Sequence, residues 1–259
     1  MTQGGLFDGF PLWVVFGATV AAFLLAAGGG YRMGARVRAR LGSNAMTDMG
    51  ATMGGLLGLL GLLLAFTFGM AGERFDRRKM LVIEEANAIG TAWLRTDLIP
   101  EPPRTQAREA LRDYAQSRLD AVDASKRAEA MARSERLQVT LWSATSAAAA
   151  TAPTPPVALF VAAVNEVIDM HARRVAAAMR NPIPTTILAT LYWVAVLVLG
   201  ATGYARGLTG DRSAMATVVL TLVLSVVILL ILDLDRPGEG LLRVSQQAMQ
   251  DVRATMGPK

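Results

Sequence analysis

Four apolar runs without a charged residue divide the chain, at residues 11–31, 50–71, 183–205 and 214–232. Each is about as long as the roughly 20 helical residues that cross a hydrocarbon core of about 30 Å. No stretch shows the alternation of polar and apolar residues that is typical of a strand. The pattern therefore predicts an all-α integral membrane protein with four transmembrane helices, paired two and two.

A polar, helix-forming segment separates the second run from the third. The second run continues without a proline through residue 99, which predicts one long helix that leaves the membrane and enters a helical soluble insert. Further helices fit residues 104–122, 125–142 and 157–179, and the Ala-, Thr- and Pro-rich stretch 143–156 predicts a loop. The predicted domains are transmembrane helices one and two (1–72), a soluble domain (73–182), transmembrane helices three and four (183–232) and an amphipathic tail (233–259).

The second run carries small residues at steps of three and four, which places them on one helix face. These are Gly54, Gly58, Gly61, Ala65, Gly69 and Gly72. The opposite face is bulky and carries Leu57, Leu60, Leu64 and Phe68. Two interpretations remain open: the small residues form a packing seam between membrane helices, or one of the two faces lines a pore around an oligomer axis.

Two features of the soluble segment are candidates for function. A polar stripe of Glu84, Asn87, Thr91 and Arg95 is either a solvated helix face or the lining of a water-filled vestibule or interface. The single histidine, His171, falls on the apolar stripe of its helix, which favours a packed and hydrogen-bonded core residue over a metal ligand.

Composition narrows the chemistry. The chain has no cysteine, so disulfides and thiol chemistry are excluded, and it shows no nucleophile, phosphate-binding or zinc motif. We therefore predict that it is not an enzyme. Its net charge of +5 comes mostly from arginines near membrane ends, which indicates lipid contact and topology, not nucleic-acid binding. The uncharged spans argue against an ion-coupled transporter and suit a passive pore.

Acidic residues cluster just after the fourth apolar run, at Asp233, Asp235 and Glu239. Pro237 and Val244 exclude an EF-hand, which requires a different loop and a bidentate glutamate. The cluster is either a set of acidic groups at a membrane exit or a looser cation site completed by another segment. No other cofactor is predicted.

Residues 61–102 and 232–245 resemble a bacterial bestrophin-like family, a membrane domain of unknown function. The second segment departs from the family motif because no Phe follows Pro237. A more distant similarity to bestrophin ion channels rests on Phe75-Asp76-Arg77 and on the order of spans, helical insert, spans and acidic tail. That resemblance implies a homopentamer, an axial pore lined by span two, a cytoplasmic insert and a calcium site after span four.

Aligning Arg77 with the bestrophin arginine puts the pore neck at Gly61, Ala65 and Gly69. A shift of one residue brings Leu60, Leu64 and Phe68 there instead.

The residue patterns and the family resemblance together predict one function, that of a homo-oligomeric ion channel of the bacterial inner membrane. Its partners are the lipid bilayer, other copies of the chain and inorganic ions. The predicted pore lining is Leu57, Leu60, Gly61, Leu64, Ala65 and Phe68, and the vestibule lining is Glu84, Asn87, Thr91 and Arg95. The alternative is a non-conducting membrane scaffold or sensor whose soluble helices bind a partner. A membrane-attached enzyme is the third and weakest interpretation.

Overall fold

The computed structural model describes residues 9–41, 49–179, 183–211, 213–236 and 240–257. Every regular element in these ranges is a helix, as predicted. Four of the helices are long and apolar enough to cross a membrane: Leu12–Arg40, Gly50–Leu98, Thr185–Thr209 and Met215–Asp235. The predicted fold class, with four candidate spans and a helical insert between the second and the third, is confirmed.

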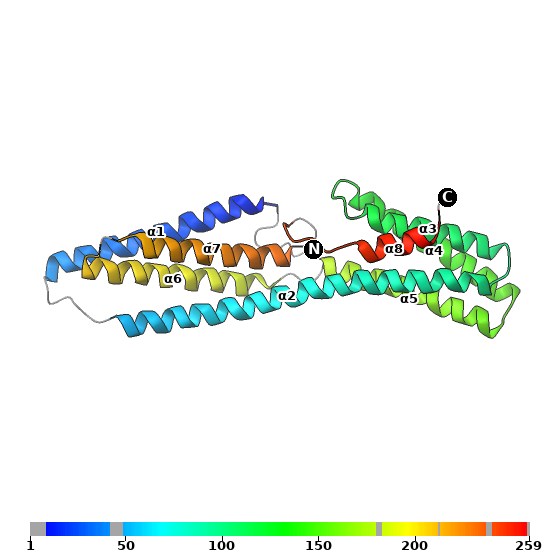
Figure 1. The fold of residues 1–259 in the computed structure, drawn as a ribbon, viewed down its shortest axis with the longest axis horizontal. Coiled ribbons are helices and arrows are strands. Elements are labelled where there is room, and N and C mark those ends of the chain that lie inside the picture. Colours follow the sequence, from blue (N-terminus) through cyan, green and yellow to red (C-terminus); the bar gives the residue numbers. More distant parts are fainter. Residues whose placement is uncertain (1–8, 42–48, 180–182, 212, 237–239, 258–259) are drawn as a thin grey trace. The chain divides into compact units, whose positions relative to one another are not determined.

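Figure 1 shows the helices in chain order. Their bounds are α1 (Leu12–Leu41), α2 (Gly50–Arg95), α3 (Pro103–Asp120), α4 (Arg127–Thr151), α5 (Pro155–Met179), α6 (Thr185–Thr209), α7 (Met215–Asp235) and α8 (Gln247–Thr255), with a short 3-10 helix η2 (Thr96–Leu98) after α2.

The chain forms two compact units. The first comprises Met1–Arg74 and Pro182–Leu242 and is called the membrane unit below. The second comprises Phe75–Asn181 and Arg243–Lys259 and is called the soluble unit. Helix α2 contributes residues to both units. The segment 233–259, expected as a single tail, is divided between them after Leu242.

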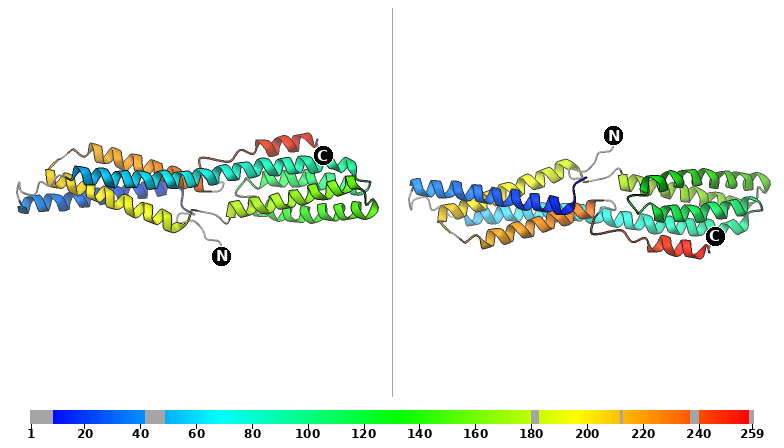
Figure 2. Two further views of the ribbon diagram at one scale, coloured as in Figure 1. Left: turned by 90° about the horizontal axis from the view of Figure 1, so that it is seen from below. Right: turned by 90° about the horizontal axis from the view of Figure 1, so that it is seen from above.

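In the membrane unit, α1 packs against α6 along most of its length, and α7 lies beside both (Figures 1 and 2). Glycines make this close approach possible. A Cβ at Gly203 would overlap the backbone carbonyl of Ala27, and one at Gly30 would overlap the carbonyl of Gly200. The spacing of four between Gly203 and Gly207, which faces Tyr31, repeats the contact one turn further along. Small residues at this spacing let membrane helices pack backbone to backbone.

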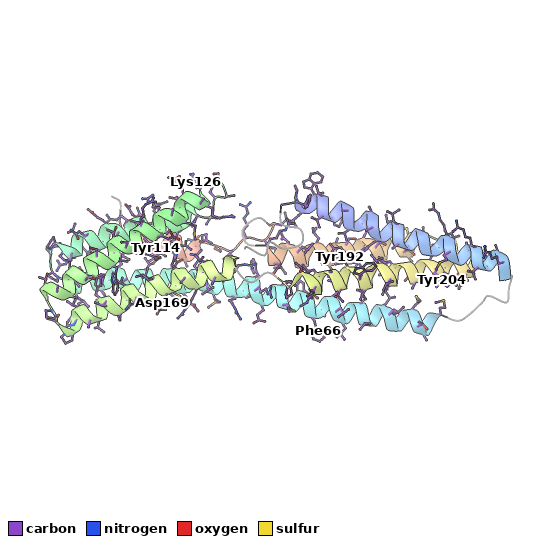
Figure 3. All side chains as sticks on the ribbon, turned by 180° about the vertical axis from the view of Figure 1, so that it is seen from behind. Phe66, Tyr114, Lys126, Asp169, Tyr192 and Tyr204 are labelled. Carbon is purple, nitrogen blue, oxygen red and sulfur yellow. The ribbon has the colours of Figure 1, made fainter. Side chains whose placement is uncertain are left out.

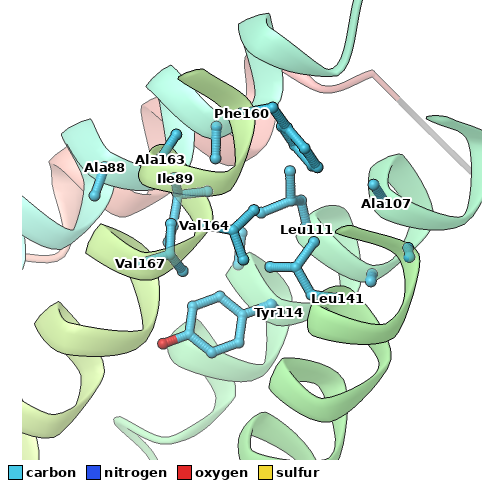
Figure 4. Packing of buried hydrophobic residues seen from close by; sticks show 14 of the residues in the cluster. Ala88, Ile89, Ala107, Leu111, Tyr114, Leu141, Phe160, Ala163, Val164 and Val167 are labelled. Atoms are coloured by element: carbon cyan, nitrogen blue, oxygen red, sulfur yellow. The ribbon is translucent and has the colours of Figure 1, made fainter. Parts of the chain in front are cut away.

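In the soluble unit, α3, α4, α5 and the α2 segment form an antiparallel bundle, and α8 packs on α3 (Figure 2). Figure 4 shows the centre of its core, where Tyr114 lies among apolar side chains of the neighbouring helices. The fully buried members include Ile89, Leu111, Leu141, Phe160 and Val164. On α5 the buried residues Phe160, Val164 and Val167 recur at steps of three and four, which is the expected pattern for a helix with one buried face.

Three predictions about helix ends are wrong. Helix α4 runs to Thr151, through the stretch 143–151 that was expected to be a loop. Alanine is the best helix former, and Thr145 and Thr151 bond back to the carbonyls of Leu141 and Ala147. The low-complexity stretch is therefore an Ala-rich part of α4, and the helix ends at Thr151, just before Pro153.

Helix α1 continues to Leu41, ten residues past the predicted end of the first span. Its last part is rich in arginine, a good helix former, and contains no breaker. Helix α3 ends at Asp120, so Val122, the last residue of the predicted helix, lies outside it and is 42% exposed.

Candidate functional site

Helix α2 presents one buried face to the rest of the membrane unit. Leu60 and Leu64 are 1% and 8% exposed, and Thr67 and Ala71 continue the same face. The hydroxyl of Thr67 bonds to the Leu63 carbonyl within the helix, so this polar group is satisfied. These side chains hold α2 against the unit.

The small residues of α2 lie on another, open face. In the described part of the chain, no atom lies within 4 Å of a Cβ built at Gly54, Gly58, Gly61, Gly69 or Gly72. Ala65 belongs to the same exposed stripe. Within this chain the stripe is therefore not a packing seam, in contrast to the glycines of α1 and α6.

A second exposed stripe lies beside the first. Leu59 and Leu62 are 50% and 52% exposed, and Phe66 is 65% exposed and projects from the outer side of α2 (Figure 3). Phe68 borders the small residues and is 41% exposed, while Leu57 is half-buried.

The predicted pore-lining residues thus belong to different faces. Gly61, Ala65 and Phe68 are exposed, whereas Leu60 and Leu64 are packed inside their own unit. Sequence periodicity placed four bulky residues on one stripe, but it could not indicate which edge of that stripe the other helices cover.

The polar stripe of the soluble unit lines an open groove between α2 and α5 of about 370 Å³. Its lining includes the predicted Glu84, Asn87, Thr91 and Arg95, and it adds Glu166 from α5, which the sequence analysis did not single out. Arg95 fixes the α2 end of the groove because its Nη1 donates to the carbonyl of Leu159 over 2.8 Å. The four predicted residues are therefore brought together in one polar depression.

Glu85, the residue that follows Glu84 of this stripe, belongs to a buried cluster of charged groups. Glu85 is completely buried and is paired with two arginines. Arg118 Nε lies 3.1 Å from Glu85 Oε1, and Arg174 Nη1 binds Oε2. The Tyr114 hydroxyl donates to Oε1 over 2.7 Å and lies 3.1 Å from His171 Nδ1.

The hydrogen bonds fix the histidine tautomer. Tyr114 has a single hydroxyl hydrogen, and it goes to Glu85. The Nδ1 of His171 must then carry a hydrogen and donate to the Tyr114 oxygen. The expectation that His171 is a packed and hydrogen-bonded core residue is confirmed, since it is 7% exposed.

Burial and neighbouring charge shift the pKa values in this cluster. Burial alone would raise the pKa of Glu85, but Arg118, Arg174 and the Tyr114 hydrogen bond lower it below its ordinary value. Burial lowers the pKa of His171, and Arg118 lowers it further. Burial and Glu85 raise the pKa of Tyr114. At neutral pH the cluster therefore holds one carboxylate, two guanidinium groups, a neutral tyrosine and a neutral histidine.

The acidic residues Asp233 and Asp235, in the last turn of α7, act as anchors for the backbone. Asp233 is 2% exposed, and its two oxygens accept hydrogen bonds from the backbone N–H groups of Leu241 and Leu242 at 2.7 and 3.0 Å. Asp235 accepts from the N–H of Ile183 at 3.0 Å and pairs with Arg74 at 3.4 Å.

The calcium site at these residues stays a prediction. Calcium is bound by oxygen ligands, and in the structure N–H and guanidinium donors contact both carboxylates. In the described residues no group of three His, Cys, Asp or Glu side chains is close enough to hold a metal ion. Glu239, the third predicted ligand, lies outside the described residues.

The sequence analysis missed Glu85, Tyr114, Arg118 and Arg174. A signal was present, because Glu85 shares the apolar helix stripe that contains Val82, Ala86 and Ile89. A charge on an apolar stripe is expected to be paired. Its partners come from α3 and α5, however, and no pattern in one sequence pairs side chains of separate helices.

The fold and these sites define a helical membrane protein with a four-helix membrane unit and a bundled soluble unit. Comparison with known families then gives its family. The model of the Bestrophin-like domain matches residues 20–249, which is most of the chain. The chain belongs to this family, as its motifs predicted.

Solved structures agree with this assignment of the fold. A bacterial bestrophin homologue from Klebsiella pneumoniae is 14% identical, with a TM-score of 0.67 over 95% of this chain and 97% of that one. Another structure, described only as a membrane protein, is 14% identical with a TM-score of 0.66 over the same shares. The comparison with curated proteins gave no match.

Proposed function

We propose that this chain forms a homo-oligomeric, bestrophin-like ion channel that conducts ions passively through a central passage lined by α2. The observation that carries the proposal is the uncharged stripe of Gly58, Gly61 and Ala65, which nothing in the described chain covers. A membrane helix that exposes a small-residue face is suited to close approach by other copies or to lining a passage.

The burial of Leu60 and Leu64 favours the register that puts Gly61, Ala65 and Gly69 at the neck. In the proposed channel these three exposed residues face the passage with Phe68 beside them, while Leu60 and Leu64 hold α2 to its own unit. The apolar constriction then depends on Phe68 and the half-buried Leu57. We propose a wider neck than a ring of leucines would make.

The groove between α2 and α5 is proposed as the vestibule lining. It offers Glu84, Glu166 and Arg95 together with the neutral Asn87 and Thr91. Mixed charges in this groove leave the sign of the permeant ion to experiment. The proposed location is the bacterial inner membrane, crossed four times, with the soluble unit in the cytoplasm and five copies in the ring.

Ion flux into liposomes tests the function. Purified protein should release a trapped ion gradient for at least one of several cations and anions. Ala65→Leu, which narrows the proposed passage, should reduce the flux, while Leu62→Phe on the second exposed stripe should leave it unchanged. No flux with any ion would refute the proposal. If Leu62→Phe reduced the flux and Ala65→Leu did not, the passage would be lined by the Leu59–Leu62–Phe66 stripe instead.

Cross-linking tests the arrangement independently of conduction. The chain has no cysteine, so single cysteines give an unambiguous result. Cysteine in place of Ala65 should link copies into dimers on oxidation, whereas cysteine in place of the buried Leu64 should not.

A scaffold or sensor remains the second candidate, for one structural reason. Residues 137–165 of the soluble unit contain no charged residue, yet Val139, Trp142 and Leu159 are 72%, 42% and 51% exposed. Exposed apolar side chains that form one patch are typical of binding sites for other proteins, and the scaffold interpretation requires that these do so. A scaffold requires neither ion flux nor cross-linking at Ala65, so the two experiments above distinguish it from a channel.

A further inference from the structure

A groove between α1 and α7 of the membrane unit is left open by the protein. It has a volume of about 390 Å³, and its lining includes Leu24, Gly28 and Tyr31 of α1, Arg206 of α6, and Thr217 and Val218 of α7. All of these residues belong to the membrane unit, and those of α1 and α7 lie in candidate membrane-spanning helices. The medium beside such helices is lipid.

One end of the groove is polar and positively charged. Arg206 Nη1 donates to the Thr217 hydroxyl over 2.7 Å, Nη2 binds the carbonyl of Ser213, and the guanidinium lies 5.8 Å from the centre of the Tyr31 ring. Its Nε is buried and makes no hydrogen bond, although the Asp211 carboxylate lies 3.6 Å away. The guanidinium is thus held in place at this end of the groove, next to the Asp211 carboxylate.

The rest of the groove is apolar. Leu24 and Val218 are 41% and 39% exposed, and no atom lies within 4 Å of a Cβ at Gly28. From Tyr31 to Leu24 the helix rises by about 10 Å, at about 1.5 Å per residue. The groove therefore begins at a charged end and continues along an apolar floor, which is the polarity of a phospholipid.

The charge around the polar end favours an anion. The last part of α1 carries Arg32, Arg36, Arg38 and Arg40 without an acidic residue. Arg38 lies against the turn after α6, since a Cβ at Gly210 would overlap its guanidinium. Among the described residues of that turn, only Asp211 is acidic. Basic residues at a membrane boundary attract anionic lipid headgroups.

We propose that this groove binds an anionic phospholipid, with the phosphate at Arg206 and one acyl chain along Leu24, Gly28 and Val218. Charge-assisted hydrogen bonds from a guanidinium to phosphate oxygens are strong, and Tyr31 supplies an aromatic surface at the same level. The lipid would fill the space between α1 and α7 that no side chain of the described protein fills.

Native mass spectrometry of the full-length protein in detergent tests this proposal. The probes are phosphatidylglycerol and phosphatidylcholine with identical acyl chains. Gly28→Leu places a side chain in the groove at a position where a Cβ meets no protein atom, and Gly29→Leu is its matched control because that position is also open but does not line the groove. We expect wild type and Gly29→Leu to retain phosphatidylglycerol in preference to phosphatidylcholine, and Gly28→Leu to bind it about tenfold more weakly.

Three results would overturn the proposal. Equal retention of the two lipids by the wild type would show that the charged end does not select an anion. Equal binding of phosphatidylglycerol by Gly28→Leu and Gly29→Leu would show that the lipid binds elsewhere. Loss of oligomer mass in Gly28→Leu, with no lipid on the wild type, would show that a second copy of the chain occupies the groove.

Discussion

Tyr114 on α3 donates its hydroxyl hydrogen to Glu85 on α2 over 2.7 Å, and both side chains are buried. This bond connects two helices at the place where Arg118 and Arg174 bring two positive charges to one carboxylate. The soluble unit therefore depends on a charged group inside its core, directly behind the exposed Glu84 of the α2–α5 groove.

Neutralising the carboxylate should destabilise the soluble unit. Glu85→Gln leaves Arg118 and Arg174 buried without a counter-charge, which costs about 3 kcal/mol. We expect amide hydrogen exchange in α3 and α5 of the detergent-solubilised protein to accelerate about 100-fold, because 1.4 kcal/mol corresponds to about tenfold.

Glu84→Gln is the matched control, since the neighbouring side chain is exposed and should change stability by no more than about 0.5 kcal/mol. Similar exchange rates in the two variants would mean that the buried ion pairs do not hold the bundle together.

The soluble unit should lose stability in mild acid because of His171. Its folded-state pKa lies below the ordinary value of 6.5 through burial and Arg118. The stability it contributes is therefore complete above about pH 6.5 and is lost as the pH falls through the folded-state pKa. Hydrogen exchange of α5 amides should accelerate between neutral pH and the acid side of that pKa, after correction for the intrinsic exchange rate.

His171→Asn keeps a donor toward Tyr114 but does not titrate, so it should remove this part of the pH dependence. A second loss at lower pH should survive in the variant. It comes from Glu85, whose lowered pKa contributes stability above its ordinary value of 4.5 and loses it below. An unchanged acid profile in His171→Asn would assign the sensitivity to other groups.

The contact between α1 and α6 should not tolerate a methyl group. Gly203→Ala places a carbon on the backbone carbonyl of Ala27, and overpacking of this kind costs about 1–3 kcal/mol. The thermal unfolding midpoint of the solubilised protein, followed by tryptophan fluorescence, should fall. Gly29→Ala, where no atom lies within 4 Å, should keep the wild-type midpoint or raise it slightly. A lower midpoint in Gly29→Ala but not in Gly203→Ala would contradict the close packing of α1 on α6 at Gly203.

Asp233 should stabilise the chain after α7 without calcium. Gly240 leaves room for its carboxylate to reach the N–H groups of Leu241 and Leu242, because a Cβ there would overlap Asp233. Asp233→Asn can no longer accept both bonds and should cost about 1–3 kcal/mol. We expect a lower thermal midpoint for Asp233→Asn, and the same wild-type midpoint with added calcium or with a chelator.

A calcium-dependent midpoint in the wild type, abolished in Asp233→Asn, would show instead that the acidic residues bind the ion. That result would support the calcium site that the resemblance to bestrophins implies.

Hydropathy and helical periodicity determined much of this protein. The four apolar runs needed no partner to be recognised, because a membrane span is defined by length and composition along one segment. Family motifs at 61–102 and 232–245 likewise belong to single segments. The stripe of Glu84, Asn87, Thr91 and Arg95 was visible for the same reason, since residues at this spacing share a helix face in any environment.

Only the tertiary structure decided which faces are covered. It buried Leu60 and Leu64, left the glycines of α2 open, and placed the close helix contact at Gly203 and Gly30. It also joined Glu85 to side chains from α3 and α5 and directed the acidic groups at the end of α7 toward backbone donors. Periodicity fixes the angle of a residue around its own helix, but burial and pairing depend on where the other helices lie, and a single sequence does not encode those distances in any local pattern.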